Sequence, residues 1–236
     1  MAIKKSKNEK TTTVLDKVKP AAITGVSCID YDKFVKSLTN LEKVRIIDFD
    51  NYQFYTSTIM QEVNFYCKSY KVKNKKFKEL FEQKLNDFGF DESILKRKII
   101  TLSTNEKKKF YLLLNLSFDF DSVILRNIFK CVDKRNYNIY LKEIKNLKEQ
   151  KKKILLIDDI NILYTINDQM LILKGNKIIK LGDSKEILND VKYLIDNNIE
   201  PPYLSKLTYL AKEKKGIKLF YQNDVRDVIK DVYKHV

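Results

Sequence analysis

The segment DSVILRNIFKCVDKRNYNIYLKEIKNLKEQKKKILLIDDI, residues 121–160, contains two apolar runs separated by a charged stretch. The runs at 123–125 and 154–157 are short, rich in Ile, Leu and Val, and without alternation, which is typical of strands buried on both faces. The stretch between them has apolar residues at helical spacing and predicts an amphipathic helix. Strand, helix and strand in this order predict a βαβ unit with parallel strands.

The alternation of strands and helices continues on both sides of this unit. Upstream, strands are predicted in 21–30 and 43–49, and helices in 31–41, 57–70, 73–90 and 110–118. Downstream, the pattern predicts a helix over 160–168, two strands around the Gly175-Asn176 turn, and a helix over 184–198. Such an order is typical of an α/β domain with a mostly parallel sheet.

The two ends of the chain differ from this middle part. Residues 1–20 are rich in Lys and Thr and predict a flexible basic leader. Pro201-Pro202 interrupt the chain, and 203–236 predict a small helical tail. We therefore divide the chain into a leader (1–20), a main domain (21–200) and a C-terminal extension (201–236).

The composition excludes several classes of protein. No run of about 18 apolar residues is present, so no transmembrane helix is expected. The basic N-terminus lacks the apolar core of a secretory signal, so a cytoplasmic location is expected. The three cysteines are far apart and indicate neither a disulfide framework nor a metal site. The single histidine, His235, is near the end of the chain, which excludes chemistry that needs an internal histidine base.

The net charge of +15 raises the question of nucleic-acid binding. The positive charge comes from 41 Lys and only 5 Arg, and it is interleaved with 31 acidic residues. Nucleic-acid sites favour Arg, whose planar guanidinium binds bases and phosphates through two hydrogen bonds. A Lys-coated, solvated surface is therefore the preferred interpretation, and nucleic acid is not expected as a partner.

The order of these segments resembles the nucleotide-binding domain of ABC transporters. A Leu-Ser pair (102–103) precedes a helix, and strands ending in ILRN and LLIDD and then a hairpin follow. More narrowly, 168–188 and the Pro-containing segment 197–219 are similar to the ATPases of energy-coupling-factor importers for cobalt and vitamins. The resemblance covers about residues 20–220. It implies a P-loop NTPase (RecA-like) α/β core, a helical insert at about 59–120, and a truncated N-terminal antiparallel sheet.

The phosphate loop of that family, G-x-x-G-x-G-K-S/T, falls on residues 25–32. Its glycines and Lys cradle phosphates, and its hydroxyl binds Mg²⁺. Here Gly25 keeps the first position, Tyr31 replaces the Lys, and Asp32 replaces the hydroxyl. The resemblance thus implies a degenerate loop that disfavours Mg·ATP. A plain strand, turn and helix would produce the same local sequence.

The family's other nucleotide-site positions also carry different residues. Asp48 replaces the Mg²⁺-contacting Gln, and Arg126 and Asn127 replace the Asp-Glu pair that binds Mg²⁺ and polarises water. Asp158 replaces the switch His, whereas Asp133 matches the family's D-loop aspartate. No catalytic residue or metal ligand is therefore expected in this chain. Binding of ATP with Mg²⁺ is expected only if a partner subunit supplies the site.

The family's LSGGQ signature reads Leu102-Ser103-Thr104-Asn105-Glu106 in this chain. Both glycines are lost, and Leu102 and Ser103 remain. By its residue types alone, Ser103 with Glu106 three positions later predicts a capping box at a helix N-terminus.

The segment 51–66 is similar to the family region that contacts a membrane subunit. Gln53, Ser57, Thr58 and Glu62 keep its pattern. They predict a coupling surface, with a simple packed helix as the alternative.

Three functions remain open on the sequence. The preferred one is an ABC-type subunit without its own ATP hydrolysis that acts as a structural or coupling partner in a transporter complex. The second is an ATP-binding subunit that works only as a heterodimer with an active ATPase. The third is a scaffold protein outside transport. The first two imply an ATPase-like partner and a membrane-embedded subunit, which would bring the chain to the inner face of the cell membrane.

Overall fold

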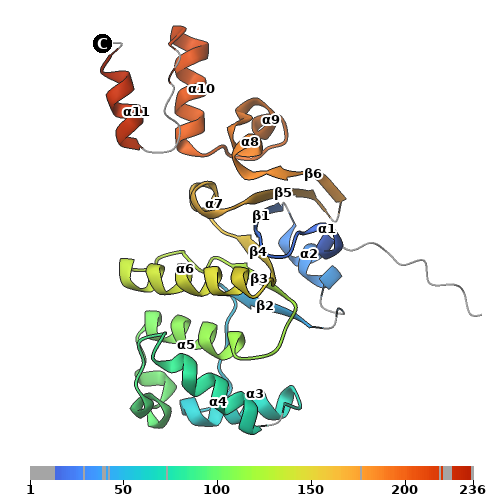
Figure 1. Ribbon diagram of the computed structural model, residues 1–236, viewed down its shortest axis with the longest axis vertical. Helices are drawn as coiled ribbons and strands as arrows, with labels where there is room; N and C mark the ends of the chain where they lie inside the picture. The colour runs from blue at the N-terminus through green and yellow to red at the C-terminus, as the bar shows by residue number, and fades with distance from the viewer. Residues whose placement is uncertain are drawn as a thin grey trace, which may run out of the picture.

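The computed structural model describes residues 14–28, 30–38, 41, 43–72, 74–175, 177–217, 219 and 225–234. A six-stranded sheet in the order β2-β3-β4-β1-β5-β6 forms the centre, and helices cover both of its faces (Figure 1). Five strands are parallel, and β6 pairs antiparallel with β5. The predicted α/β fold with a mostly parallel sheet is confirmed. The strands are β1 (Ile23–Cys28), β2 (Val44–Asp48), β3 (Ser122–Arg126), β4 (Lys153–Ile157), β5 (Gln169–Lys174) and β6 (Lys177–Asp183).

The helices form three groups along the chain. The first group flanks β1 and consists of α1 (Val14–Lys17) and α2 (Tyr31–Leu38). The second group lies between β2 and β3 and consists of α3 (Ile59–Ser69), α4 (Asn74–Leu85), the 3₁₀ turns η1 (Glu92–Lys96) and η2 (Ile99–Thr101), and α5 (Thr104–Leu116). The remaining helices are α6 (Lys134–Glu149), α7 (Ile160–Ile166), α8 (Ser184–Asn189), α9 (Val191–Asp196), α10 (Tyr203–Lys215) and α11 (Val225–Val232). In Figure 1 the α3–α5 group and the α10–α11 pair lie at opposite ends of the molecule. No helix among the described residues combines the length and apolar character needed to cross a membrane.

Successive residues of the central strands face two separate apolar cores, because side chains alternate across a strand. Leu125 and Leu156 belong to the core on the side of α5 and α6, and Ile124 and Leu155 belong to the core on the side of α1 and α2. Burial on both faces explains why these strands are continuous apolar runs in the sequence.

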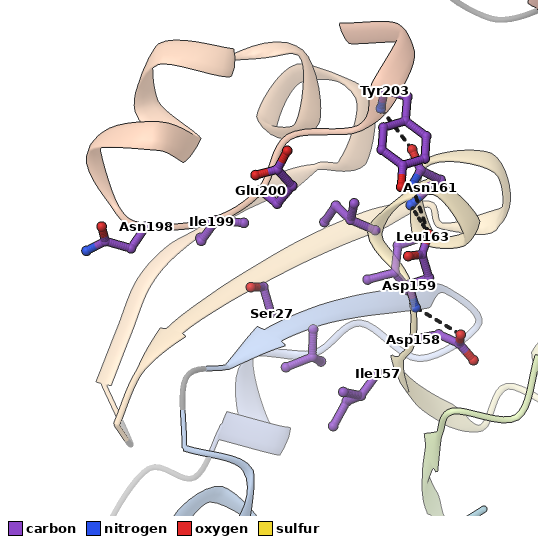
Figure 2. A pocket seen from close by; sticks show the side chains of 12 residues that line it. Ser27, Ile157, Asp158, Asp159, Asn161, Leu163, Asn198, Ile199, Glu200 and Tyr203 are labelled. Atoms are coloured by element: carbon purple, nitrogen blue, oxygen red, sulfur yellow. Dashed lines mark hydrogen bonds between the residues drawn. The ribbon is translucent and has the colours of Figure 1, made fainter. Parts of the chain in front are cut away.

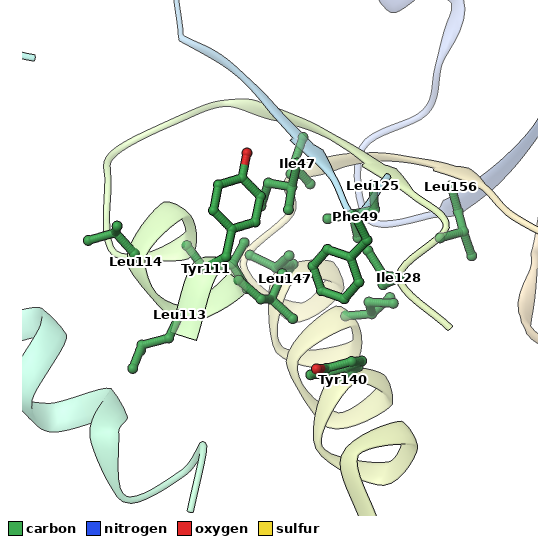
Figure 3. Close-up of a cluster of buried hydrophobic side chains, with 14 of the residues drawn as sticks. Ile47, Phe49, Tyr111, Leu113, Leu114, Leu125, Ile128, Tyr140, Leu147 and Leu156 are labelled. Carbon is green, nitrogen blue, oxygen red and sulfur yellow. The ribbon is translucent and has the colours of Figure 1, made fainter. Parts of the chain in front are cut away.

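The larger core joins the α3–α5 group to the sheet (Figure 3). Phe49 packs edge-on against Tyr140 of α6, with ring centres 5.7 Å apart. Leu113 and Leu114 of α5 are fully buried in the same cluster. This packing fixes α5, and with it the Leu102–Glu106 segment, relative to the strand ends.

Part of the predicted flexible leader, residues 14–18, packs against the domain. Val14, Leu15 and Val18 are buried against the α2 side of the sheet, and residues 14–17 form α1. The many Lys residues around these three apolar residues hid their pattern in the sequence. Their burial is favourable because they cover apolar surface of the sheet. Residues 1–13 of the predicted leader and His235 lie outside the described residues. Among the described residues before β1 there is no strand.

Candidate functional site

The carboxyl ends of β2, β3, β4 and β1 lie at one edge of the sheet, where ligands bind in open α/β folds. The strand register places Asp48 beside Arg126, and Arg126 beside Ile157, the residue before Asp158. Tyr31, at the start of α2, reaches the same edge because its ring lies against Arg126. The structure thus brings together positions that are more than 100 residues apart in the sequence.

Arg126 is held at this edge by two carboxylates and an aromatic ring. Its Nη1 lies 2.9 Å from Asp48 Oδ2, its Nη2 lies 3.7 Å from Asp50 Oδ2, and its guanidinium carbon lies 4.0 Å from the centre of the Tyr31 ring. Burial disfavours the charged guanidinium, but the hydrogen bond and charge of Asp48 outweigh it and raise the pKa of Arg126. We call Arg126, Asp48, Asp50 and Tyr31 the arginine cluster.

Asp50 is also bound by the residues that follow β3. Asn127 Nδ2 donates a hydrogen bond to its Oδ2, and Lys130 Nζ lies 3.4 Å from its Oδ1. Burial would raise the pKa of this carboxyl, but the hydrogen bonds from Asn127 and Lys130 and the charges of Lys130 and Arg126 lower it on balance. Sequence reasoning missed Asp50 and Lys130; the two acidic residues Asp48 and Asp50, separated only by Phe49, were the available signal.

Asp158 joins the ends of β3 and β4. Its Oδ2 accepts the backbone N–H of Phe129 at 3.0 Å, and its Oδ1 accepts that of Asp159 at 2.9 Å. Burial raises the pKa of Asp158 above the usual range, and the two amide hydrogen bonds oppose that effect. The side chain therefore works as a fixed acceptor for the loops around the site.

A cavity of about 440 Å³ opens next to Asp158, between the ends of β1 and β4, α7 and the 198–203 link (Figure 2). Its lining includes the carboxylates of Asp158, Asp159 and Glu200 and the ring of Tyr203, but no Lys or Arg. Three carboxylates without a lining cation repel a polyanion. Among the described residues, no group of His, Cys, Asp and Glu is arranged to hold a metal ion.

Gly25 does not lie in a phosphate-binding loop. Strand β1 continues past it to Cys28, and α2 begins at Tyr31. A Cβ added to Gly25 would lie 1.6 Å from Nδ2 of Asn167, so glycine is required by the packing of that amide. Asp32 is exposed in the first turn of α2.

Ser103 and Asp133 form a second group, at the N-termini of α5 and α6. Ser103 Oγ accepts the N–H of Glu106 at 3.2 Å, and Glu106 accepts the N–H of Ser103 at 2.8 Å, which confirms the predicted capping box. Asp133 accepts hydrogen bonds from the N–H of Asn136 at 2.9 Å and from Asn105 Nδ2 at 3.0 Å. The side chains of Ser103 and Asp133 thus cap the N-termini of α5 and α6.

The residues predicted to couple to a partner separate into buried and exposed members. Glu62 is fully buried, and its carboxylate accepts hydrogen bonds from the N–H and hydroxyl of Thr56, at 2.9 and 2.6 Å. Thr58 caps α3. Gln53 and Ser57 are exposed on the loop that Glu62 holds in place.

A groove of about 650 Å³ runs beside this loop. One wall of the groove is formed by η2 and the start of α5, and sequence reasoning missed it. The available signal was Ile100, an apolar residue next to the polar segment that starts α5. The lining residues are Tyr52, Phe54, Thr56, Ser57, Lys98, Ile99, Ile100 and Lys107. We call this the 52–107 groove.

Comparison with known proteins links this architecture to transport ATPases. No family model matches the chain. It is 27% identical over 211 residues to the energy-coupling factor transporter ATP-binding protein EcfA2 of Mycoplasmopsis synoviae, which covers 89% of this chain and 67% of that protein. It is 23% identical over 185 residues to EcfA2 of Staphylococcus aureus, which covers 78% of this chain and 63% of that protein. The chain therefore matches only about two thirds of the length of these relatives.

Solved structures agree on the fold. An ATP-binding subunit of an ABC transporter superposes with a TM-score of 0.63 at 13% identity, over 84% of this chain and 90% of that one. The cbiO1 subunit of Clostridium perfringens, part of the cbiONQ ABC transporter complex, superposes with a TM-score of 0.57 at 17% identity, over 81% and 89%. The fold is thus that of a P-loop NTPase of the ABC nucleotide-binding type. In sequence, the chain is similar to energy-coupling-factor transporter ATP-binding subunits.

Proposed function

We propose that this protein is a homologue of ABC ATP-binding subunits that does not hydrolyse ATP itself and serves as a structural or coupling partner in a transporter complex. The observation that carries the proposal is the arginine cluster. At the edge where an ATPase of this fold gathers Mg²⁺ and phosphates, Arg126 already neutralises Asp48 and Asp50.

Mg·ATP does not fit the residues at this edge in the usual pose. Mg²⁺ needs oxygen ligands at close range, and a guanidinium beside them repels a second cation. The ring of Tyr31 packs against the guanidinium of Arg126. The resemblance assigns this position to a Lys whose ammonium group binds phosphate, and Tyr31 has no positive charge. The neighbouring cavity adds the carboxylates of Asp158, Asp159 and Glu200, which repel a triphosphate.

The test is titration of the purified chain with Mg·ATP in a calorimeter, followed by a phosphate-release assay. We expect no binding in the micromolar range and no turnover. Micromolar affinity with phosphate release by the isolated protein would contradict the proposal.

A second function is favoured by a separate observation. Ser103 is exposed at the N-terminus of the 13-residue helix α5, where a helix dipole attracts anions, and the curated relatives carry the name ATP-binding protein. A partner with its own phosphate loop would then use Ser103 in a composite site. In the purified complex, Ser103→Arg would abolish ATPase activity, while Ser93→Arg, at another exposed serine, would leave the rate unchanged. An unaltered rate in Ser103→Arg excludes this alternative.

The partners we propose are a membrane-embedded transporter subunit and an ATPase-like subunit. The 52–107 groove supports the first, and exposed apolar residues on α10 and α11 support the second. The relatives are named as transporter components, and we propose that these partners bring the protein to the inner face of the cell membrane.

A further inference from the structure

Two cationic side chains converge on the turn that follows α4. Nζ of Lys109, on α5, lies 3.8 Å from the position that a Cβ of Gly89 would occupy, and Nη2 of Arg135, in the first turn of α6, lies 3.5 Å from it. No other atom of the described chain beyond residues 88–90 lies within 4 Å of that position. Gly89 is exposed and has a φ of +66°, which favours glycine, so the missing side chain leaves room for a ligand beside both cations.

Neither cation has a carboxylate partner. Within the ranges that the structure describes, the side chains of Lys109 and Arg135 form no ion pair and no hydrogen bond. The Lys109 side chain is only 8% exposed, and its ammonium group lies 4.2 Å from the centre of the Phe90 ring. Charges buried this deeply are normally paired, because leaving them without a counterion costs solvation free energy. The fold therefore holds two neighbouring cations that lack an anion.

The carboxylates that act on Lys109 are already engaged by other groups. Glu106 binds Arg97 at 3.0 Å, and Asp133 caps α6. Burial and then the charge of Arg135 lower the pKa of Lys109, and the opposing charges of Glu106 and Asp133 do not cancel this effect. An anion placed beside both cations would remove their mutual repulsion and would therefore bind favourably.

From these contacts we infer that Lys109, Arg135 and the turn at Gly89 form a binding site for a phosphate group, either the free ion or an organic phosphate monoester. The planar guanidinium of Arg135 suits two phosphate oxygens at once, and the ammonium group of Lys109 binds another as a point charge. Two positive charges also match a phosphate dianion better than they match chloride or a single carboxylate. The exposed turn at Gly89 opens the site to solvent.

The site joins two parts of the molecule. Lys109 belongs to the α3–α5 group, whereas Arg135 belongs to α6, which packs on β4. A bound phosphate would thus connect α5 to α6. Ser103 lies six positions before Lys109 and so on a different face of α5, which separates this site from the composite ATP site considered above. The inference does not depend on the proposed function.

The test titrates the full-length protein with sodium phosphate and, separately, with glycerol 3-phosphate, at an ionic strength held constant with sodium chloride. We expect the melting temperature to rise by roughly 3–6 °C when the ligand is at ten times its Kd. Tighter binding of glycerol 3-phosphate by ~10-fold would identify an organic monoester as the ligand, and equal binding would identify the free ion. No rise with either compound would overturn the inference.

Matched variants separate this site from the general stabilisation that phosphate gives to proteins through its exclusion from their surface. Arg135→Gln should weaken phosphate binding ~10-fold. Lys134→Gln removes the same charge from the adjacent exposed position and should bind phosphate as the native protein does. Lys109→Met, which keeps an unbranched apolar stem, should lose the phosphate response. Equal responses in Arg135→Gln and Lys134→Gln would overturn the inference.

The pKa of Lys109 gives a measurement that does not depend on stability. A phosphate beside the ammonium group favours its charged form and should raise this pKa. The NMR signal of Lys109 Cε, identified by its loss in Lys109→Met, follows the titration. Arg135→Gln should raise the pKa of Lys109 without phosphate, because it removes a repelling charge, and phosphate should then shift it less. A pKa of Lys109 that is the same with and without phosphate would contradict the site.

Discussion

At the carboxyl edge of the sheet, where ligands bind in open α/β folds, single side chains make contacts within the chain. Arg126 binds Asp48 and Asp50, and Asp158 accepts two backbone amides. Gly25 remains a glycine, but the side chain of Asn167 fills the space over it. A residue that matches a motif can therefore be kept for packing, and a residue that departs from it can form a new structural contact.

Gly25→Ala is expected to destabilise the fold by about 1–3 kcal/mol, because its Cβ would overlap the Asn167 amide and force the strand or side chain to move. Urea unfolding measures the change. Gly182→Ala is the matched control, since a Cβ there meets Ile187 Cδ1 at an ordinary 3.5 Å. Asn167→Gly should restore much of the lost stability in the double variant. Equal effects at the two glycines would contradict this explanation.

Arg126→Ser is expected to cost about 2 kcal/mol, because it leaves the mostly buried carboxylate of Asp48 without its charged partner. The freed Asp48 and Asp50 should then accept a divalent cation, so millimolar Mg²⁺ should raise the melting temperature of the variant but not that of the native protein. Arg126→Lys, which keeps the positive charge, should show no Mg²⁺ response. A native protein stabilised by Mg²⁺ to the same extent would contradict the role given to Arg126.

At the scale of elements, local signals defined where several helices begin. The capping box predicted from Ser103 and Glu106 starts α5 at Thr104, because the two residues satisfy each other's backbone N–H groups. Other boundaries depended on contacts that a local pattern does not contain. The helix predicted over 184–198 is divided at Asp190, whose side chain accepts the N–H of Tyr193 and starts α9.

Glu106→Gln is expected to lower stability at pH 7 by about 1 kcal/mol. The backbone N–H of Ser103, then its hydroxyl and Arg97, lower the pKa of Glu106 against an opposing effect of burial. A depressed carboxyl pKa stabilises the fold above the unfolded value of about 4.3 and stops doing so as the pH falls through the folded value. The difference between variant and native protein should therefore shrink as the pH falls below the unfolded value, as measured by urea unfolding. Glu149→Gln, at an exposed position, should have little effect at either pH.

On the scale of the whole molecule, the end formed by α10 and α11 has apolar surface left uncovered. Tyr203, Leu207 and Leu210 are exposed at helical spacing on α10, and Val225 and Ile229 are exposed one turn apart on α11. This surface lies at the opposite end of the molecule from the α3–α5 group (Figure 1). The two partner surfaces can therefore be occupied together.

Leu207→Glu with Ile229→Glu is expected to weaken association with another subunit at least ~10-fold, because charged side chains would have to be buried in an apolar contact. Sedimentation of the purified chain over a concentration series measures its self-association. The melting temperature should not change, since both side chains are exposed. Ile195→Glu, at an exposed position on α9, is the control. A native protein that stays monomeric throughout would argue against this contact.

The sequence by itself determined the class of fold and the order of its strands and helices. Apolar runs such as 154–157 are typical of strands buried on both faces, and the amphipathic stretches between them predict crossover helices. The same residues specified the cap of α5. These features depend on local periodicity and hydrogen bonding, which a linear sequence contains.

The tertiary structure alone decided which side chains meet. Asp48 and Arg126 are 78 residues apart and form an ion pair only because β2 and β3 are adjacent and in register. The requirement for Gly25 comes from Asn167, and the burial of α1 comes from the sheet face it covers. Contacts between distant segments depend on strand order, register and packing, and the local sequence pattern does not specify these.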